Sequence, residues 1–357
     1  METLSDHELL LIPSYLPLRD YQLKNGRYTV DLGAGRDYKR LELDEKSFKV
    51  LKLFLSPNTM KDAAKRTNIP FEDVQKFCDC LKHERLLIPY QSCSDAYEKY
   101  SRHLQYYGLC GLDPIVSQDR LNDLTITLIG VGGIGNWIGL NLIGLGIKKL
   151  KLIDSDTIEE SNLPRQILFN ENDIGKFKVD VAARELRKRK TNLDLEIIKD
   201  DATESNIFEL VSNSDFVVLS ADKPFFKIQK WTNAACVKYK TPLLNVGYAA
   251  EEGMMGPLVV PEFSSCLACN SNLDENNYHL KNNAQENPFM RHFIPPSFVC
   301  LNSLISSMAS YEIVKYFLNF GECISLNNLV RINPRTFSIN KIPHLKDPLC
   351  TMCNHIQ

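Results

Sequence analysis

One uncharged, glycine-rich stretch restricts the folds open to this chain. "ITLIGVGGIGNWIGLNLIGLGI" runs from Ile126 to Ile147 and carries seven glycines. Its length would suffice to span a bilayer, and small residues four apart, such as Gly135 and Gly139, also occur where membrane helices pack. Its parts favour another interpretation: "LTITLIG" is typical of a strand, an apolar helix follows the glycines, and "KKLKLIDSD" is typical of a second strand. We therefore predict a strand–turn–helix–strand unit of an α/β fold.

Composition agrees with a globular protein. The chain has 357 residues, 44% of them hydrophobic and 24% charged, which is enough for about two domains. Its net charge of −2 provides no bulk attraction to nucleic acid or to an anionic membrane, so we expect neither as a partner. The acidic N-terminus "METLSDHELLLIPSYLPL" does not resemble a secretory signal. We expect a cytoplasmic protein whose eleven cysteines are thiols or metal ligands.

The glycines after the first strand match a phosphate-binding pattern. Gly130, Gly132 and Gly135 satisfy G-x-G-x-x-G, and Asp154 follows about twenty residues later, where a ribose-binding acid is expected. Glycine permits a sharp turn, lets a phosphate approach the backbone, and leaves the N–H groups of the helix N-terminus open to an anion. The same glycines suit an NAD-dependent dehydrogenase, and a tight turn that binds nothing would also contain them.

The next segment favours a polyphosphate. "SDTIEESNLPRQILFNENDIGKFKVD" contains Asp156, Asn162, Arg165, Gln166 and Lys178. Arg165 and Lys178 beside a glycine turn would supply cations for a polyphosphate whose charge shifts during a reaction. Mg²⁺ requires a carboxylate, and Asp222, at the end of the apolar strand in "FVVLSADKP", could supply it. Taken singly, Lys178 fits a solvated helix and Arg165 a local ion pair equally well.

Taken together, the motifs "GVGGIG", "LIDSDTIEESNLPRQ", "GKFKVD" and "SADKP" resemble the ubiquitin-activating-enzyme-like (E1/ThiF/MoeB) adenylating superfamily in order and spacing. The resemblance implies a Rossmann-like domain with a mostly parallel sheet that binds ATP and Mg²⁺. It implies that Arg165, Lys178 and Asp222 are catalytic, with Asp222 at the Mg²⁺, and that Asp154 binds the ribose hydroxyls. The implied nucleotide-binding residues are Gly130, Gly132, Gly133, Gly135, Asp154, Asp156, Asn162 and Gln166.

The segment "KYSRHL" resembles a short arginine-containing segment of the same superfamily. In that superfamily the arginine reaches the ATP of the other subunit. The resemblance therefore implies that Arg102 acts in trans and that the active species is a homodimer.

Two cysteine pairs point to a metal. "CLAC" provides Cys266 and Cys269, and "CTMC" provides Cys350 and Cys353, enough thiolates for a closed tetrahedral zinc site. Their separation is too long for a compact zinc ribbon, so the metal would tie the C-terminus to the body of the protein. A redox pair is the alternative. The resembling superfamily has a structural zinc in this arrangement.

Many relatives also carry a catalytic cysteine that forms a thioester. Here the segment after the first pair, "NSNLDENNYHLKNNAQENPFMRHFIPPSF", contains no cysteine. Cys300 follows at the head of the apolar helical run "CLNSLISSMASYEIVKYFL", where we expect it to be packed. The sequence therefore predicts adenylation without a thioester intermediate.

The first 95 residues predict a separate domain, followed by an adenylation domain over 96–357. "GRYTVDLGAGRDYKRLEL" predicts a hairpin, and three short helices and a strand follow, a winged-helix pattern. Its third helix balances acidic and basic residues, which argues against DNA binding. An edge strand can instead bind a peptide by strand addition. A small winged-helix domain before an adenylation domain resembles the leader-peptide clamps of enzymes that modify ribosomally made peptides.

This resemblance to the peptide-modifying branch of the superfamily, the enzymes of the microcin C7 and pantocin A type, covers nearly the whole chain. It implies ATP-dependent adenylation of a carboxylate on a ribosomally made precursor peptide in antibiotic biosynthesis. The carboxylate would be C-terminal in the first type and a glutamate side chain, leading to cyclisation, in the second. The alternatives are an NAD-dependent oxidoreductase, which would bind NAD, and a non-catalytic peptide-binding protein, which would not turn over ATP.

Overall fold

The computed structural model describes residues 8–13, 16–22, 26–32, 39–90, 98–224, 226–249, 251–269 and 296–354. The chain divides into two compact units, Met1–Ser117 and Gln118–Gln357. The domain boundary expected after residue 95 lies within 91–97, outside the described residues.

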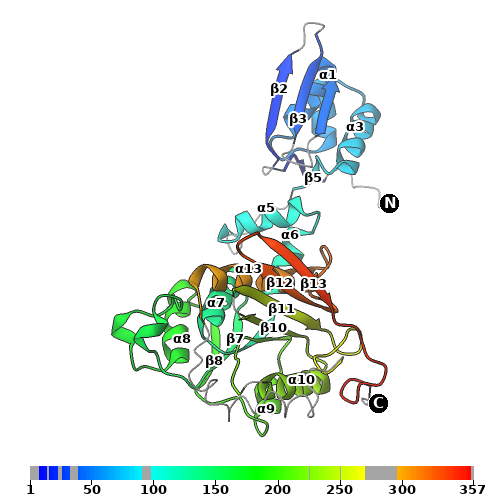
Figure 1. Ribbon diagram of the computed structural model, residues 1–357. Helices are drawn as coiled ribbons and strands as arrows, with labels where there is room; N and C mark the ends of the chain where they lie inside the picture. Colours follow the sequence, from blue (N-terminus) through cyan, green and yellow to red (C-terminus); the bar gives the residue numbers. More distant parts are fainter. Residues whose placement is uncertain are drawn as a thin grey trace. The chain divides into compact units, whose positions relative to one another are not determined.

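The part of the first unit up to Pro89 combines a small sheet with helices α1, α2 and α3 (Figure 1). Strands β2 (Leu18–Gln22), β3 (Tyr28–Leu32) and β4 (Lys39–Leu43) form an antiparallel sheet in that order, and β1 (Leu10–Leu11) pairs with β5 (Ile88–Pro89). The helices are α1 (Glu45–Leu53), α2 (Met60–Thr67) and α3 (Phe71–His83). The hairpin and the three helices agree with the sequence-based prediction, whereas β2 is an additional strand that we did not predict.

Local capping explains where these helices begin. The Asp44 carboxylate accepts a hydrogen bond from the backbone N–H of Ser47 at 2.7 Å, and α2 begins with the same arrangement at Thr59. Their apolar faces close on one core, in which Leu10 and Phe54 are fully buried. Helices α5 (Ser101–Leu109) and α6 (Pro114–Asn122) follow α3 and β5 in the sequence.

The second unit is built on an eight-stranded sheet in the order β13-β12-β11-β10-β9-β6-β7-β8. The parallel part comprises β6 (Thr125–Ile129), β7 (Lys149–Ile153), β8 (Asp194–Ile198), β9 (Phe216–Leu219) and β10 (Leu243–Ala249). The antiparallel extension comprises β11 (Glu252–Val259), β12 (Asn328–Asn333) and β13 (Ser338–Pro343). This α/β sheet confirms the predicted Rossmann-like fold class.

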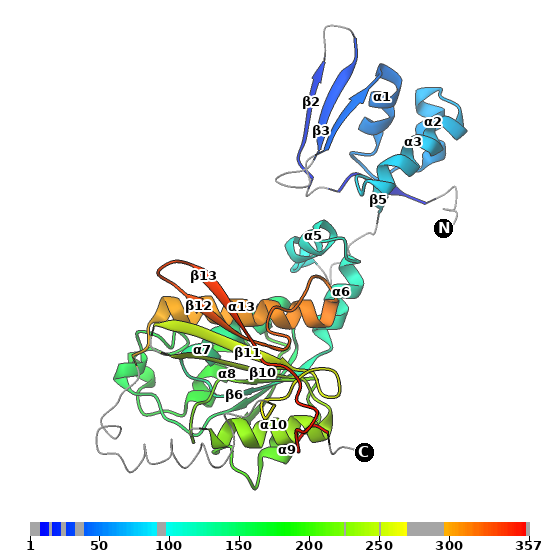
Figure 2. The ribbon, with the colours of Figure 1, turned by 45° about the vertical axis from the view of Figure 1, so that its right-hand side comes forward.

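Helices cover both faces of this sheet. Figures 1 and 2 show α7 (Gly133–Leu145) and α13 (Val299–Leu318) on one face, with α9 (Ile207–Val211) and α10 (Lys227–Tyr239) on the other. Helix α8 (Lys178–Arg189) connects β7 to β8. The uncharged stretch of the sequence is divided between β6 and α7, as predicted. In the part of the chain that the structure describes, no helix has the length and apolarity needed to cross a membrane.

The strand order determines where a ligand can approach. The chain runs from β6 to its neighbour β7 on one side, whereas β9 pairs with β6 on the other side. In open α/β sheets, ligands bind outside the carboxyl ends of the strands where the order reverses in this way. The residues that follow Ile129 of β6 and Leu219 of β9 therefore form the expected ligand-binding edge.

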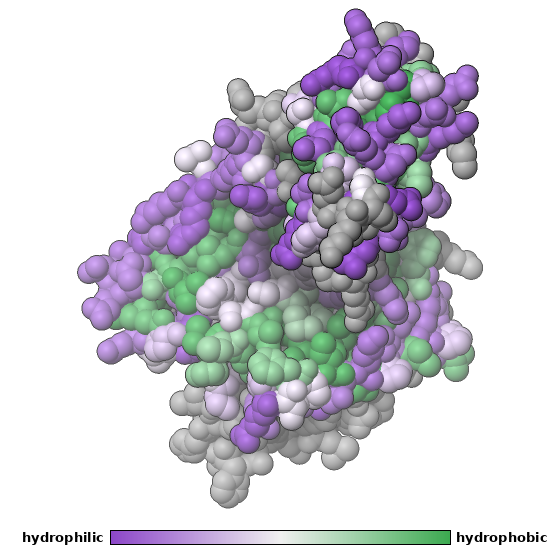
Figure 3. All heavy atoms as spheres, turned by 90° about the horizontal axis from the view of Figure 1, so that it is seen from above, coloured by the Kyte–Doolittle hydropathy of each residue, from purple (hydrophilic) through white to green (hydrophobic). Residues whose placement is uncertain are grey.

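The surface carries both polar and apolar residues. Figure 3 shows green hydrophobic areas bordered by purple hydrophilic ones on one face of the molecule. Large exposed apolar side chains include Phe337, just before β13, and Leu345, just after it. Single exposed apolar side chains are normal on folded proteins, so we assign no function to them.

Gly146 ends α7 in a conformation that favours glycine. Its φ is +105°, its N–H donates to Ile143 and the next N–H donates to Leu142, a C-terminal motif that stops the helix before β7. A Cβ atom here would lie 2.3 Å from the Gln118 amide nitrogen. We predict that Gly146→Ala lowers the free energy of unfolding by about 1–3 kcal/mol, measured by chemical denaturation.

Gly144 is the matched control for this prediction. It lies within the same helix, and a Cβ atom there would meet no atom of the described residues within 4 Å. Gly144→Ala should leave the free energy of unfolding unchanged or raise it by about 0.5–1 kcal/mol. Equal losses in both variants would contradict the role given to Gly146.

Candidate functional site

The glycine turn between β6 and α7 depends on two close approaches. Gly130 has φ +94°, and a Cβ atom on it would lie 2.6 Å from the backbone nitrogen of Ala221. A Cβ atom on Gly135 would lie 2.1 Å from the carbonyl oxygen of Gly130. Glycine at these positions lets the first turn of α7 pack directly onto the ends of β6 and β9.

The same turn leaves the N-terminus of α7 open. Gly132 precedes the helix, and among the described residues no side chain caps its first turn. If residue 132 had a Cβ atom, the nearest described atom would be the Gln166 amide nitrogen, at 4.0 Å. Uncapped N–H groups and the helix dipole favour an anion at this position. The geometry therefore fits the phosphate-binding role that the sequence predicts for Gly132 and Gly133.

Asp154 lies across from the turn, at the carboxyl end of β7. Its Oδ2 accepts a hydrogen bond from the Val131 N–H at 2.7 Å, and its Oδ1 accepts one from the Asp156 N–H at 2.9 Å. Burial raises the pKa of the Asp154 carboxyl group, while the nearby Lys178 ammonium and these two bonds act in the opposite direction. The carboxylate is thus held in one orientation, which suits a hydrogen-bond acceptor for ribose hydroxyls.

Lys178 is buried, unlike a lysine on a solvated helix face. Lys178 is the first residue of α8, and only 7% of its surface is exposed. Its Nζ lies 2.6 Å from the Asp156 carboxylate. The backbone positions the pair as well, because the Lys178 N–H donates to the Asp156 carbonyl at 3.0 Å. Burial of the ammonium with a single carboxylate partner argues against the solvated-helix interpretation and favours a functional one.

The segment around Arg165 packs against the glycine turn. A Cβ atom on Gly133 would lie 3.6 Å from Cγ of Arg165, whose guanidinium donates to the Ser161 carbonyl. Asn162 is buried, and its Oδ1 accepts from the Glu159 N–H at 3.2 Å. The structure therefore brings Arg165 beside the predicted phosphate site, with Asn162 holding the turn that carries it.

Gln166 lies at the same turn and is 3% exposed. Its Oε1 is buried and has no hydrogen-bond partner within the described part of the protein. Buried polar atoms are normally paired, so an unpaired one beside a predicted ligand site suggests a ligand group.

Asp222 is exposed and follows β9 by three residues, next to the Ala221 backbone that contacts Gly130. Its carboxylate is therefore on the ligand-binding edge, as a Mg²⁺ ligand must be.

Arg102 belongs to the first unit. It is exposed on α5, where its Nη1 donates to the Gln105 side chain at 3.3 Å.

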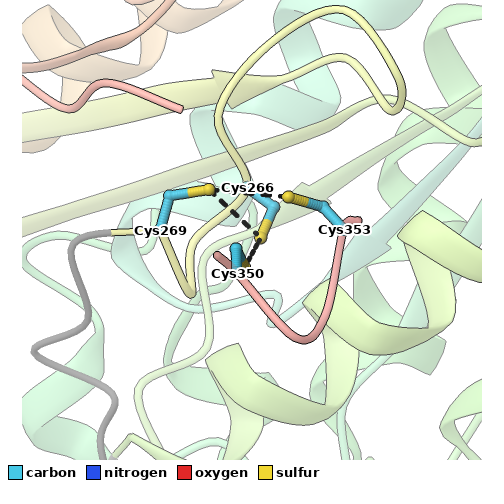
Figure 4. Close-up of side chains that lie close together, drawn as sticks. All are labelled: Cys266, Cys269, Cys350 and Cys353. Atoms are coloured by element: carbon cyan, nitrogen blue, oxygen red, sulfur yellow. Dashed lines mark hydrogen bonds between the residues drawn. The ribbon is translucent and has the colours of Figure 1, made fainter. Parts of the chain in front are cut away.

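The four cysteines of the two C-x-x-C pairs converge (Figure 4). Their sulfur atoms all lie within 4.8 Å of one another. The sulfur–sulfur distances are 3.7 Å for Cys266–Cys350, 3.9 Å for Cys266–Cys269 and 3.6 Å for Cys269–Cys353. A tetrahedral zinc with Zn–S bonds of about 2.3 Å places its sulfurs about 3.8 Å apart. The cluster fits a structural zinc better than two separate redox pairs.

The surroundings of the cluster fit the same ion. Burial and the neighbouring thiols raise the pKa of Cys266 to about 11, so clustered thiolates here require a cation. The Asn233 amide accepts from the Leu267 N–H at 3.0 Å, between the two cysteines of the first pair. His344 contacts the Cys266 carbonyl at 2.9 Å. These contacts hold the segment carrying Cys266 and Cys269 in place, the supporting role expected around a metal site.

Two buried asparagines were not predicted. Asn136, on α7, donates to the carbonyls of Val131 and Gly132 and accepts from the Leu168 N–H at 3.0 Å, so it ties the glycine turn to the segment after Arg165. Asn302, on α13, lies against Gly133. In the sequence the only signal of either residue was an amide within an otherwise apolar helical run.

The expectation for Cys300 was wrong. It is exposed rather than packed. The buried face of α13 passes through residues such as Leu301, Ile305 and Ala309, so position 300 falls on the opposite side with Tyr311. The preceding segment in which relatives carry a cysteine lies mostly within 270–295, outside the described residues.

Comparison with known proteins places this geometry in a family. Residues 100–352 match the ThiF family, so the chain belongs to it. Among its relatives, the sulfur carrier protein ThiS adenylyltransferase of Bacillus subtilis is 35% identical over 156 residues, 43% of this chain and 45% of that protein. The ThiS adenylyltransferase of Escherichia coli is 31% identical over 173 residues, 48% of this chain and 66% of that protein. The matches thus span less than two thirds of these relatives.

Solved structures extend the likeness to both units. The crystal structure of E. coli MccB with succinimide matches with a TM-score of 0.79 and 28% identity, covering 97% of this chain and 99% of that one. MccB with ATP matches with a TM-score of 0.77 and 29% identity over the same shares. MccB is described as a microcin C7 biosynthetic enzyme, solved also with MccA. PaaA, at 21% identity and a TM-score of 0.65 over 76% of this chain, shares the fold.

The cysteine cluster predicts a measurable metal dependence. The purified protein should contain about one zinc per chain by elemental analysis, and Cys350→Ser should lose it, because three thiolates hold the ion less tightly than four. We expect Cys350→Ser to unfold about 10 °C lower or more in thermal denaturation. Cys80→Ser, at an exposed cysteine on α3, is the control and should retain the metal. A metal-free wild-type protein with an unchanged Tm after chelation would refute the zinc site.

Proposed function

We propose that this chain is an ATP-dependent adenylating enzyme that activates a carboxylate of a ribosomally made precursor peptide. The observation that carries the proposal is the placement of two cations around the glycine turn. The Arg165 side chain lies against Gly133, and the buried Lys178 ammonium acts on Asp154, whose carboxylate accepts from the Val131 N–H of the turn. Hydride transfer leaves the charge on the phosphates of NAD unchanged, whereas nucleotidyl transfer builds up negative charge on the phosphates of ATP, which cations stabilise. The likeness to MccB over nearly the whole chain, including a complex with ATP, supports the same activity.

The proposed reaction is a nucleotidyl transfer. A peptide carboxylate oxygen attacks the α-phosphorus of ATP, a new O–P bond forms, and the bond from that phosphorus to the bridging oxygen breaks, so pyrophosphate leaves. Arg165 and Lys178 stabilise the negative charge that builds up on the phosphate oxygens. Asp154 orients the nucleotide through its ribose. Asp222 would hold Mg²⁺, which would neutralise part of the phosphate charge.

Lys178 is suited to this role by its pairing with Asp156. The 2.6 Å contact fixes the ammonium before a nucleotide arrives, so little reorganisation is needed in the transition state. Burial also reduces screening by water, which strengthens the attraction between the ammonium and a phosphate.

The first unit is proposed to hold the peptide. Strands β2 and β4 are the outer strands of its antiparallel sheet, and a peptide can add to such an edge through main-chain hydrogen bonds. Crystal structures of MccB with MccA support a peptide partner. Truncating MccA from the end remote from the reacting carboxylate should raise its KM and leave kcat unchanged; an unchanged KM would contradict the clamp.

We propose that the adenylate forms no thioester, because residues 270–298 contain no cysteine. The exposed Cys300 that follows them is the thiol to test, and Cys300→Ser should leave the peptide product unchanged. Without a thioester, the adenylate is either the product or is attacked by a nucleophile of the same peptide. A C-terminal carboxylate and a glutamate side chain both remain candidates for activation. Mass spectrometry of the peptide after incubation with ATP separates added AMP from lost water. Since the proposed reaction consumes ATP, we place it in the cytoplasm, which cell fractionation tests.

Charge removal at the proposed phosphate site tests the activity. Arg165→Ala and Lys178→Ala should each lower MccA-dependent pyrophosphate release by about 10²-fold, because each removes a cation that stabilises the transition state. Lys188→Ala is the matched control on α8: its side chain is 62% exposed and paired with Glu185, so pyrophosphate release should be unchanged. Wild-type rates in both site variants would refute the assignment.

The role in trans is a separate proposal for Arg102. If its guanidinium completes the site of a second subunit, Arg102→Ala and Lys178→Ala homodimers should both have little activity. Mixing them with subunit exchange should restore up to about a quarter of the wild-type rate, because half of the dimers are mixed and each has one intact site. No recovery, with exchange shown by native mass spectrometry, would place Arg102 outside the partner's site.

A further inference from the structure

A buried amide on α13 has no partner that explains it. Asn302 is fully buried, and its Nδ2 donates to the Ser297 hydroxyl at 3.1 Å. Its Oδ1 is also buried, and no described residue offers it a hydrogen bond. Leaving a buried amide oxygen unpaired is unfavourable, so a group is needed that pairs with this side chain in the working protein.

Packing between α13 and α7 does not require this amide. Ser306, one turn further along the same face, donates to the Ile134 carbonyl at 3.1 Å, and Ser310 accepts from Asn141 at 3.2 Å. These two contacts orient the helices relative to each other. Asn302 lies on the same face of α13 as Ser306 and Ser310, nearer the glycine turn. Within the described ranges it forms no hydrogen bond to α7, so its polar side chain is not needed for packing the two helices.

Asn302 occupies the space that glycine leaves at position 133. A Cβ atom on Gly133 would lie 2.4 Å from Nδ2 and 3.3 Å from Cγ of Asn302. Gly133 is the first residue of α7, so the amide lies beside the first turn of this helix. Gln166, with its own unpaired Oε1, lies beside Gly132. Two buried amides with unpaired atoms therefore border the same pair of glycines.

We propose that Asn302 is a further nucleotide-contacting residue whose amide N–H donates to a phosphate oxygen of ATP at the N-terminus of α7. This inference rests on the proposed function. Rotating the amide by half a turn exchanges Nδ2 and Oδ1, and the Ser297 hydroxyl then donates instead of accepting, so the bond between them is kept. Phosphate oxygens accept hydrogen bonds and do not donate them, which selects the N–H group as the one that faces the nucleotide.

Binding of Mg·ATP to the full chain, measured by titration calorimetry, tests the proposal without a peptide. Asn302→Ala should raise the Kd for ATP about 10-fold to 100-fold, the effect of one hydrogen bond to a charged group. Asn302→Asp should raise it further than Asn302→Ala, because a carboxylate cannot donate and repels phosphate. Ser306→Ala, one turn away, removes a helix-packing bond and should leave the Kd within about 2-fold of wild type.

Thermal denaturation of each variant identifies a temperature at which all of them are folded, and the binding measurements are made at that temperature. If the buried charge prevents Asn302→Asp from folding, Asn302→Leu replaces it. A Kd for Asn302→Ala within about 2-fold of wild type, or equal to that of Ser306→Ala, would overturn the contact. Tighter binding by Asn302→Asp than by Asn302→Ala would also overturn it, because the amide would then act as an acceptor. Failure of the wild-type protein to bind ATP would instead refute the proposed function itself.

Discussion

The structure of the second unit depends on the close approach of backbone to backbone at the turn between β6 and α7. Gly130 meets the backbone of Ala221 at the end of β9, and Gly135 meets the carbonyl of Gly130. A side chain at either position would push α7 away from the sheet. This packing aims the uncapped N-terminus of α7 at the carboxyl edge of the strands, where an anion is stabilised by free N–H groups. Every proposed role in nucleotide binding refers to that point.

Residues distant in the sequence gather around this turn for reasons of topology. Asp154 follows β7 and Asp222 follows β9, the two strands that flank β6, so both carboxylates lie on the edge of the sheet from which the turn begins. Asn136 links the turn to the segment of Arg165, and α13 closes the other side with Asn302. The site therefore draws on elements from both halves of the second unit.

Much of this arrangement could be predicted from local patterns. The glycine spacing predicted the strand–turn–helix unit, because backbone strain and close approach act over a few residues. The two C-x-x-C pairs predicted a four-cysteine cluster, because cysteine pairs at this spacing have few uses. The packing of Cys300 was predicted wrongly, because an apolar run does not reveal which face of its helix is buried when its ends are unknown.

The sequence alone determined the fold class, the glycine turn and the identity of the charged residues available to a phosphate, since these follow from local backbone chemistry and motif order. The tertiary structure decided which of those residues are buried and paired. Lys178 is held by Asp156, a contact across 22 positions of the chain, and Asn302 reaches Gly133 from a helix that begins far downstream. Burial and pairing depend on which distant elements pack together, and the spacing of residues along the sequence does not determine that packing.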